Sequence, residues 1–313
     1  MLSFKSFVGN FIARKLMISR EGFGQFLAEY AVVDDIENIP LYADRVQNNL
    51  KRFSANINLT VNYDDTELPE GSIAFHLIKG PIMYGDDPWG FFFSSKRFRE
   101  NIIKAENNPQ IGGHFFLSNS GGGDAYYLDV AAQAVADIEK PKRGVIERMS
   151  GSAAWYLLMN AGNLSAQTPN EIIGSIGTMV SGLDLIPYFE KLGAKYIEEY
   201  SHYSDRKNAK YNGLLKGDEK EKEQFIEDEL DPLALQFREA VKKARPATAN
   251  LAKDGDKEHP VFRGETYNSQ TAIDLGLIDD IMLIEDVIRL IGKEAQEYIK
   301  KQNNVSNALK LIS

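Results

Sequence analysis

The 313-residue chain contains no cysteine. This absence excludes disulfide bonds, thiolate metal sites and a cysteine nucleophile. It is consistent with a reducing compartment, so we expect a cytoplasmic protein.

Basic charge and long apolar runs are also scarce. The chain has 36 Lys and Arg against 45 Asp and Glu, a net charge of −9. Binding of phosphate backbones needs clustered basic side chains, so we expect no nucleic-acid partner. No apolar run approaches the roughly 18 residues that span a bilayer, and the N-terminus has no continuous apolar core of a secretory signal. We therefore expect no transmembrane segment.

The first residues show helical spacing of apolar side chains, with basic residues between them. The pattern predicts an amphipathic helix with the apolar positions Phe4, Phe7, Val8, Phe11, Ile12 and Leu16. We expect this helix to pack on its own domain or on a neighbouring subunit. Attachment to a membrane surface is the less favoured alternative, because a single short helix is a weak anchor.

The middle of the chain alternates apolar strands with helical stretches. Strands are predicted at residues 73–78, 113–117 and 144–148, and helices at 94–106, 125–138 and 153–159. This alternation is typical of an α/β domain with parallel strands and right-handed crossovers. We divide the chain into a helical N-terminal arm (1–66), an α/β core (67–202), a charged helical segment (203–260), a C-terminal part of the core (261–292) and a tail (293–313).

The charged segment contains one long predicted helix, residues 219–243. Its expected apolar face is formed by Phe225, Leu230, Leu233, Leu235 and Phe237. The remaining positions are rich in Lys, Asp and Glu, which indicates a helix largely exposed to solvent.

A glycine-rich loop follows the second predicted strand: Asn119-Ser120-Gly121-Gly122-Gly123-Asp124. Consecutive glycines turn the backbone sharply and leave N–H groups uncovered. Such a loop binds a phosphate or stabilises an oxyanion, and it can equally be only a tight strand-to-helix turn. No Gly-Lys-Ser/Thr follows, so the loop is not a P-loop.

A small serine lies where the next strand meets a helix, in Met149-Ser150-Gly151-Ser152-Ala153-Ala154-Trp155-Tyr156. A hydroxyl at this position lies beside the unsatisfied N–H groups at the positive end of the helix. An attacking serine and its oxyanion require this environment. The alternative is that Ser150 or Ser152 is simply an N-cap.

Two further features concern the partner of such a serine. Gly174-Ser175-Ile176-Gly177 indicates close backbone approach, and Ser175 is either a hydrogen-bonding partner of a lysine or a packed loop serine. The four histidines, His76, His114, His202 and His259, lie in no triad-like motif. His76 and His114 fall in predicted buried strands and are interpreted as core residues. A neutral lysine can replace histidine as the base if burial or nearby cations lower its pKa towards roughly 7–8.

Together these motifs resemble the protease IV and signal peptide peptidase A family of serine peptidases, including its phage capsid-protease branch. The glycine loop resembles the family's Asn-Ser-Pro-Gly-Gly loop, with Gly121 where proline is usual. Met149–Tyr156 resembles the nucleophile segment, and residues 174–177 match Gly-Ser-Ile-Gly. Residues 261–264 and 272–279 resemble the family's Val-Phe-x-Gly and Ala-x-x-x-Gly-Leu-Val-Asp ending.

The resemblance implies a crotonase-like or Clp-protease-like fold of stacked βαβ units and a homo-oligomeric ring. It implies Ser152 as nucleophile and Ser175 as the residue that positions the base. The implied base is Lys207, which follows Lys191-Leu192-Gly193 at nearly the family spacing, with Lys210 as the alternative. The implied oxyanion donors are the backbone N–H groups of Gly122 or Gly123 and Ala153.

A polypeptide substrate and no metal or cofactor follow from the same resemblance. We expect a phage or prophage head-maturation protease that cleaves scaffold or capsid proteins in the bacterial cytoplasm or the phage prohead. One alternative is a host cytoplasmic peptidase similar to signal peptide peptidases. The others are a crotonase-like acyl-CoA enzyme and a catalytically inactive assembly protein.

Overall fold

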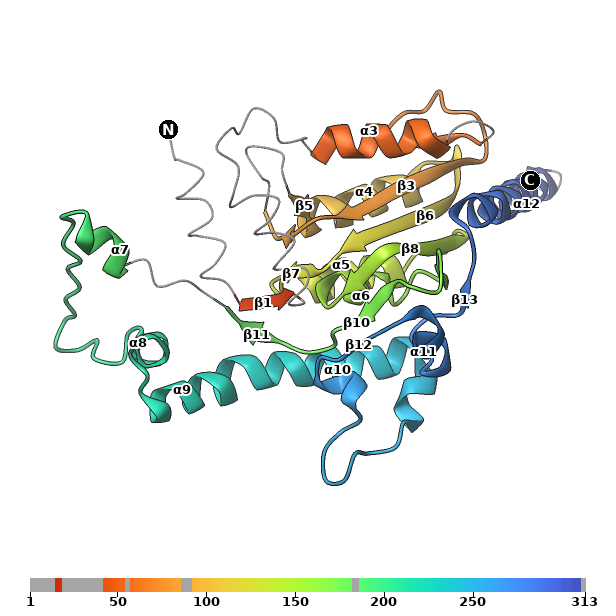
Figure 1. The fold of residues 1–313 in the computed structure, drawn as a ribbon. Helices are drawn as coiled ribbons and strands as arrows, with labels where there is room; N and C mark the ends of the chain where they lie inside the picture. The colour runs from red at the N-terminus through yellow and green to blue at the C-terminus, as the bar shows by residue number, and fades with distance from the viewer. Residues whose placement is uncertain (1–14, 19–41, 54–56, 86–91, 182–185, 311–313) are drawn as a thin grey trace.

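A computed structural model gives the fold. It describes residues 15–18, 42–53, 57–85, 92–181 and 186–310 (Figure 1). Most of the expected N-terminal helix lies outside these residues.

A sheet of mainly parallel strands forms the centre of the molecule. Its order is β12-β10-β8-β6-β3-β2, and only β12 runs antiparallel to its neighbour. Beside β8, the pair β9 and β13 adds a parallel branch. The bounds are β2 (Leu59–Thr60), β3 (Ser72–Lys79), β6 (Ile111–Ser120), β8 (Lys142–Gly151), β9 (Asn163–Ala166), β10 (Ile172–Gly174), β12 (Thr266–Tyr267) and β13 (Asp280–Ile281).

Helices cover both faces of this sheet, because the buried strands carry apolar side chains in both directions. Phe75 and Leu77 pack on α3 and α12, whereas Ile78 and Phe116 belong to the core formed with α4, α5, α6 and α10. The helices are α3 (Tyr42–Phe53), α4 (Ser95–Asn107), α5 (Leu128–Ala136), α6 (Ala153–Leu158) and α12 (Ile284–Lys310). The α/β class, its parallel strands and the three predicted strand–helix pairs are confirmed.

A second, smaller sheet lies at the end of the large one, in the order β11-β1-β7-β4-β5 (Figure 1). Its strands are β1 (Lys15–Ile18), β4 (Ile82–Met83), β5 (Phe93–Ser94), β7 (Gly122–Asp124) and β11 (Met179–Val180). Leu16 was expected in a helix but lies in β1. The helix prediction is wrong at this position, since backbone pairing with two strands outweighs local periodicity.

The long charged helix is confirmed as α9 (Glu219–Phe225), the π-helical turn η2 (Ile226–Leu230) and α10 (Asp231–Ala244). Its expected apolar face is only partly correct. Phe225 and Phe237 are buried, but Leu235 is 49% exposed. A π turn inserts an extra residue into the helix, so the face that follows it is rotated relative to a regular helix.

Between the small sheet and α9, residues 186–216 extend away from the core (Figure 1). We call this segment the extended arm. It carries α7 (Ile186–Lys191) and α8 (Ala209–Lys216). After α10 the chain passes through η3 (Pro246–Asn250), η4 (Pro260–Arg263) and α11 (Ser269–Asp274) before α12.

Two of the expected domain boundaries fall inside packed structure. In the region assigned to the N-terminal arm, β2 pairs with β3, and Phe53 of α3 packs against the large sheet. At the other end, α12 runs without a break through residue 293, and Ala295 and Ile299 are buried. Described residues from both predicted appendages therefore belong to the core.

Candidate active site

Ser152 lies immediately before α6, at the end of β8. Its backbone angles are φ 53° and ψ −119°, in a region that residues other than glycine rarely adopt. The backbone N–H of Ser152 donates to the carbonyl of Gly174 at 2.8 Å, and the carbonyl of Ser152 accepts from Tyr156 at 2.9 Å. Two hydrogen bonds thus hold the turn in a strained conformation, which is common at functional sites.

The Ser152 side chain is buried, and its Oγ has no hydrogen-bond partner among the described residues. A buried hydroxyl without a partner costs about 1–3 kcal/mol and is rare in structural positions. The side chain does not act as an N-cap either, since it makes no capping hydrogen bond. Both observations favour a chemical role for this hydroxyl.

Ser150, two residues before Ser152, has a hydroxyl that is hydrogen-bonded, unlike that of Ser152. Its Oγ accepts a hydrogen bond from Ser118 Oγ at 3.1 Å inside the sheet, and the side chain is fully buried. Ser150 therefore has the satisfied environment of a structural serine, and Ser152 is the better candidate nucleophile.

The glycine loop lies beside this turn. Ser120 and Ser150 are paired in the sheet, and α6 packs against β7. Ser120 Oγ donates to the carbonyl of Gly80 at 2.6 Å and accepts the Gly122 N–H at 3.1 Å. In this arrangement the Gly122 N–H already has a partner, whereas the N–H of Ala153, the first residue of α6, has no acceptor within the helix.

Backbone packing explains one glycine of the loop. A Cβ at Gly123 would lie 2.0 Å from the carbonyl oxygen and 2.6 Å from the nitrogen of Ile82 in β4. No side chain fits at that distance. The close approach of β4 to β7 therefore requires glycine at position 123.

Gly174 connects Ser175 to the turn at Ser152. The carbonyl of Gly174 accepts the hydrogen bond of the Ser152 N–H, and Ser175 is the next residue in the chain. Ser175 has φ 54°, is half-buried, and donates its N–H to the carbonyl of Glu265 at 2.8 Å. The backbone of the Gly-Ser-Ile-Gly motif is thus hydrogen-bonded to the turn at Ser152.

The predicted base lies elsewhere in the single chain. Lys207 is exposed, in the turns before α8 of the extended arm, and makes no hydrogen bond to Ser152 Oγ. Lys210 binds Asp228 at 2.6 Å and Glu229 at 3.6 Å, and the hydrogen bond with Asp228 raises the pKa of Lys210. A raised pKa keeps the amine protonated, which is the wrong state for a base.

The two core histidines are confirmed as buried and paired. His76 Nε2 lies 3.0 Å from His114 Nδ1, and His114 Nε2 lies 3.0 Å from Glu106 Oε2. Burial lowers the pKa of both rings, and the charge of His114 lowers that of His76 further. Neither ring is joined to the Ser152 turn.

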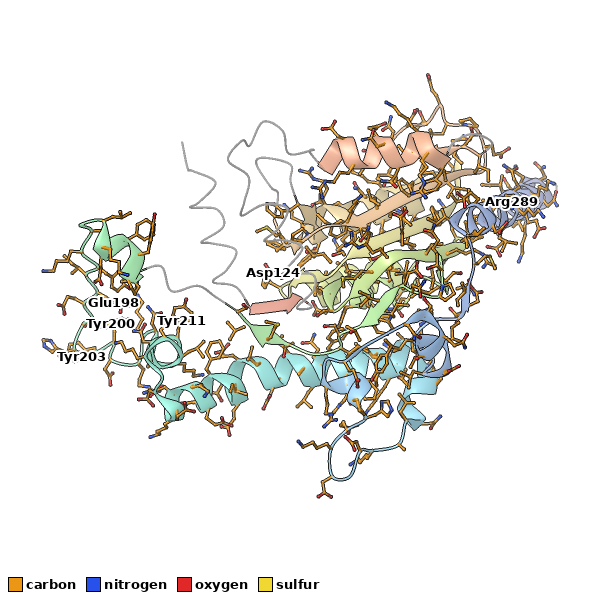
Figure 2. The ribbon with its side chains drawn as sticks, viewed as in Figure 1. Asp124, Glu198, Tyr200, Tyr203, Tyr211 and Arg289 are labelled. Atoms are coloured by element: carbon orange, nitrogen blue, oxygen red, sulfur yellow. The ribbon has the colours of Figure 1, made fainter. Side chains whose placement is uncertain are left out.

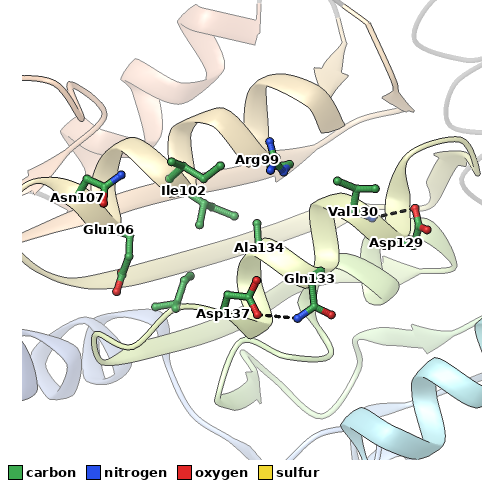
Figure 3. Close-up of a pocket in the computed structure, with 11 residues that line it drawn as sticks. Arg99, Ile102, Glu106, Asn107, Asp129, Val130, Gln133, Ala134 and Asp137 are labelled. Atoms are coloured by element: carbon green, nitrogen blue, oxygen red, sulfur yellow. Dashed lines mark hydrogen bonds between the residues drawn. The ribbon is translucent and has the colours of Figure 1, made fainter.

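A cavity of about 580 Å³ lies between α4 and α5 (Figure 3). Its walls mix apolar side chains such as Ile102 and Val130 with acidic ones such as Asp129 and Asp137. None of its lining residues belongs to the predicted motifs, so it is separate from the candidate active site. Among the described residues, no group of three or more His, Asp or Glu side chains is placed to hold a metal ion.

Two contributors to this site have no recognisable pattern in the sequence. The carbonyl of Gly174 accepts the Ser152 N–H and holds the turn at Ser152, and β1 pairs directly with the glycine loop. Both act through backbone atoms, which leave no signature in side-chain chemistry.

Comparison with known proteins identifies the family. Residues 134–297, more than half of the chain, match peptidase family S49, so the chain belongs to that family of serine peptidases. The match includes Ser152, Ser175 and Lys207.

One curated relative is "Putative signal peptide peptidase SppA" from Enterococcus faecium, 24% identical over 208 residues. The alignment covers 64% of this chain and 56% of the relative, so the chain spans little more than half of that protein's length. No helix in the described part of the chain has the length and apolar character needed to cross a membrane.

Solved structures with some likeness include an enoyl-CoA hydratase/isomerase family member, at 14% identity and a TM-score of 0.29. The alignment covers 69% of this chain and 65% of the chain in that structure. Another, from Magnetospirillum magneticum AMB-1, is described as "Putative enoyl-CoA hydratase/carnithine racemase", at 16% identity, a TM-score of 0.37 and 69% coverage of each chain. At these TM-scores the likeness carries no argument about this chain.

Proposed function

We propose that the protein is a serine endopeptidase with Ser152 as nucleophile and Lys207 as general base. The observation that carries this proposal is the Ser152 hydroxyl, which is buried and unpartnered in a strained turn beside the glycine loop. Membership of peptidase family S49 supports the reaction class.

We further propose that Lys207 acts on the Ser152 of a neighbouring subunit. The extended arm that carries it exposes many large apolar side chains, among them Leu192, Ile197 and Tyr203, which are 67%, 71% and 97% exposed. Apolar surface of this extent favours contact with another chain. Docking would remove water from the Lys207 amine, and loss of water favours the neutral form of a lysine that a base requires.

The reaction is acyl transfer. Neutral Lys207 takes the proton of Ser152 Oγ while the oxygen bonds to the peptide carbonyl carbon. The N–H groups of Ala153 and of Gly122 or Gly123 stabilise the oxyanion, each worth roughly 3–4 kcal/mol. For Gly122 this requires release of its bond to Ser120 Oγ. Ser175 orients the lysine, which then protonates the leaving amine, and water hydrolyses the acyl ester.

For the physiological role we propose head maturation of a phage or prophage, with scaffold or capsid proteins as substrates. The relative from Enterococcus faecium favours the alternative of a host peptidase similar to signal peptide peptidases. The genomic neighbourhood separates the two, because portal and major capsid genes beside this one indicate the phage role.

Four variants test the chemistry on an unfolded protein substrate such as casein, with cut sites mapped by mass spectrometry. We expect Ser152→Ala and Lys207→Ala to lose at least about 10³-fold in cleavage rate, because dyad members act as a unit. The matched controls are Ser150→Ala, which removes the hydrogen-bonded serine, and Lys195→Ala, which removes another exposed lysine of the extended arm.

Both controls should cleave within a few-fold of wild type. Cleavage by Ser152→Ala at the wild-type rate contradicts the proposal. An acyl-CoA enzyme or an inactive assembly protein predicts no cleavage by any of the five proteins.

A further inference from the structure

Helix α6 has the candidate nucleophile at one end and a second set of hydrogen bonds at the other. Ser152 and the N–H of Ala153 lie at its N-terminal end, and all six residues of the helix are buried. At about 1.5 Å per residue the helix is only about 9 Å long, so a shift at one end moves the other. The contacts at its C-terminal end therefore influence the position of Ser152.

Arg245 binds carbonyl groups at that C-terminal end. The last carbonyls of a helix have no partner within the helix, and buried carbonyls need a donor from elsewhere. Arg245 Nε donates to the carbonyl of Met159, the C-cap of α6, at 3.2 Å, and Nη2 donates to the carbonyl of Gly162 at 3.4 Å. The Arg245 side chain is only 9% exposed and follows the end of α10. One buried guanidinium thus caps the helix that carries the candidate nucleophile.

Asp279 orients this guanidinium. Arg245 Nη1 lies 3.0 Å from Oδ1 and 2.9 Å from Oδ2 of Asp279. The carboxylate also accepts the N–H of Leu164 at 2.7 Å, and the Asp279 N–H donates to the carbonyl of Leu164 at 2.9 Å. Leu164 lies in β9, which is paired with β8 of the central sheet. The planar guanidinium is therefore held between the sheet and α6 by donors of fixed geometry.

Residues 272–279, which resemble the family's chain ending, bring this carboxylate into place. Gly276 has φ 76°, and a Cβ there would lie 2.6 Å from the Cβ of Ala247. Ala247 comes two residues after Arg245, so the turn at Gly276 packs beside the segment that carries the guanidinium. Glycine suits both the left-handed backbone and the close approach. This motif has no part in the proposed chemistry, and its packing accounts for it as the support of Asp279.

The oxyanion site needs α6 to be fixed closely. Oxyanion donors act at about 2.7–3.1 Å, and a misplacement of about 1 Å caused by a distant substitution can cost about 10²-fold in rate. Without Arg245, α6 would keep apolar contacts such as that of the Tyr156 and Phe237 rings, whose centroids lie 4.8 Å apart. Apolar contact is non-directional, so it fixes the helix less closely than hydrogen bonds do.

We propose that Arg245, oriented by Asp279, is a positioning residue that holds α6 so that Ser152 Oγ and the Ala153 N–H face the same substrate carbonyl. This inference rests on the proposed function. Arg245 does not touch the substrate in this role and acts only through the helix.

The test measures kcat and KM separately, with a fluorogenic peptide built on a casein cut site mapped for the wild-type protein. Lysine at position 245 keeps the charge but loses the planar fork that binds the Met159 carbonyl and Asp279 together. We expect Arg245→Lys to lower kcat at least about tenfold and to leave KM within about twofold. The reason is that the oxyanion contact forms only in the transition state.

Asp279→Asn is a second variant, which keeps a side-chain oxygen for the Leu164 N–H and removes the ion pair with Arg245. We expect kcat to fall at least about threefold, again with KM within about twofold. This variant decides the question if Arg245→Lys does not fold.

The matched control is Arg143→Lys. Arg143 is also largely buried, and its guanidinium binds Glu294 at 2.7 Å, near the start of the same strand that ends at Ser152. Its loss should lower the midpoint of thermal unfolding without changing kcat, because Arg143 makes no contact with α6 in the described structure.

The outcomes separate this inference from the proposed function. A kcat of Arg245→Lys equal to that of wild type overturns the positioning role and leaves the peptidase intact. A rise in KM alone, or an equal fall in kcat for Arg143→Lys at the same loss of thermal stability, also overturns it. Peptide cleavage that survives in Ser152→Ala contradicts the peptidase itself, and the inference with it.

Discussion

The two buried histidines have a defined direction of hydrogen bonding. An ionised Glu106 only accepts hydrogen bonds, so His114 Nε2 carries the proton in that pair. His114 Nδ1 is then the acceptor, and the N–H of His76 Nε2 donates to it. Both rings are neutral in this arrangement, in agreement with the lowered pKa of each.

This arrangement predicts that acid destabilises the fold before the carboxylates titrate. Unfolded histidine binds a proton below about pH 6.5, whereas the buried rings resist protonation because burial lowers their pKa. The free energy of unfolding should therefore keep its full value above pH 6.5. At lower pH it should decrease by up to about 1.4 kcal/mol per pH unit for each ring.

Urea denaturation at pH 7.5, 6.0 and 5.0 measures this dependence. His202→Gln replaces an exposed ring and should leave the slope of the free energy of unfolding against pH unchanged. His76→Phe should reduce that slope. A slope that is the same in both variants rules out the buried pair as its source.

At the residue scale, much of the site follows from the sequence. The small residues around Ser152 predict a turn at a helix start, which the structure contains, although Ser152 is buried there rather than exposed. The strand positions of His76 and His114 correctly predict core histidines. The surroundings of Lys207 cannot be predicted in the same way. They depend on which surface covers the extended arm, and the local sequence carries no information about that surface.

At the scale of elements, the small sheet depends on close backbone contact between β4 and β7. Gly123→Ala places a methyl group against backbone atoms of Ile82, which cannot rotate away. We expect a loss of about 1–3 kcal/mol in the free energy of unfolding, together with reduced peptidase activity, because the glycine loop must shift.

The matched control is Gly85→Ala, whose added Cβ meets no atom within 4 Å. Thermal unfolding of both variants gives the comparison. Equal stability of Gly123→Ala and wild type contradicts the tight β4–β7 contact.

The elements that the sequence predicts well are those with strong local patterns. Apolar strands β3, β6 and β8 and the helices α4, α5 and α6 are all recognised within a few residues. β1 is not, because a strand of four residues is defined by its two partners rather than by its own sequence. The rotated face of α10 is missed for a similar reason, since a π turn has no clear sequence signal.

At the scale of the whole molecule, the extended arm stands away from the core (Figure 2). Ion pairs such as Arg206–Glu221, at 2.8 Å, join it to α9, and the Tyr200 hydroxyl donates a hydrogen bond to Glu198 within it. Tyr203 and Tyr211 nevertheless remain exposed at 97% and 39%. An arm that carries exposed apolar and aromatic side chains suits a contact with a second copy of the chain, as our proposal for Lys207 requires.

Mixing two inactive variants tests whether Ser152 of one subunit and Lys207 of another form one site, as we propose. Ser152→Ala and Lys207→Ala are each expected to be inactive alone. When they are mixed in equal amounts under conditions that allow subunit exchange, a random ring contains intact sites at about a quarter of its contacts. We predict casein cleavage at about a quarter of the wild-type rate. Activity no higher than that of either variant alone contradicts a dyad shared between subunits.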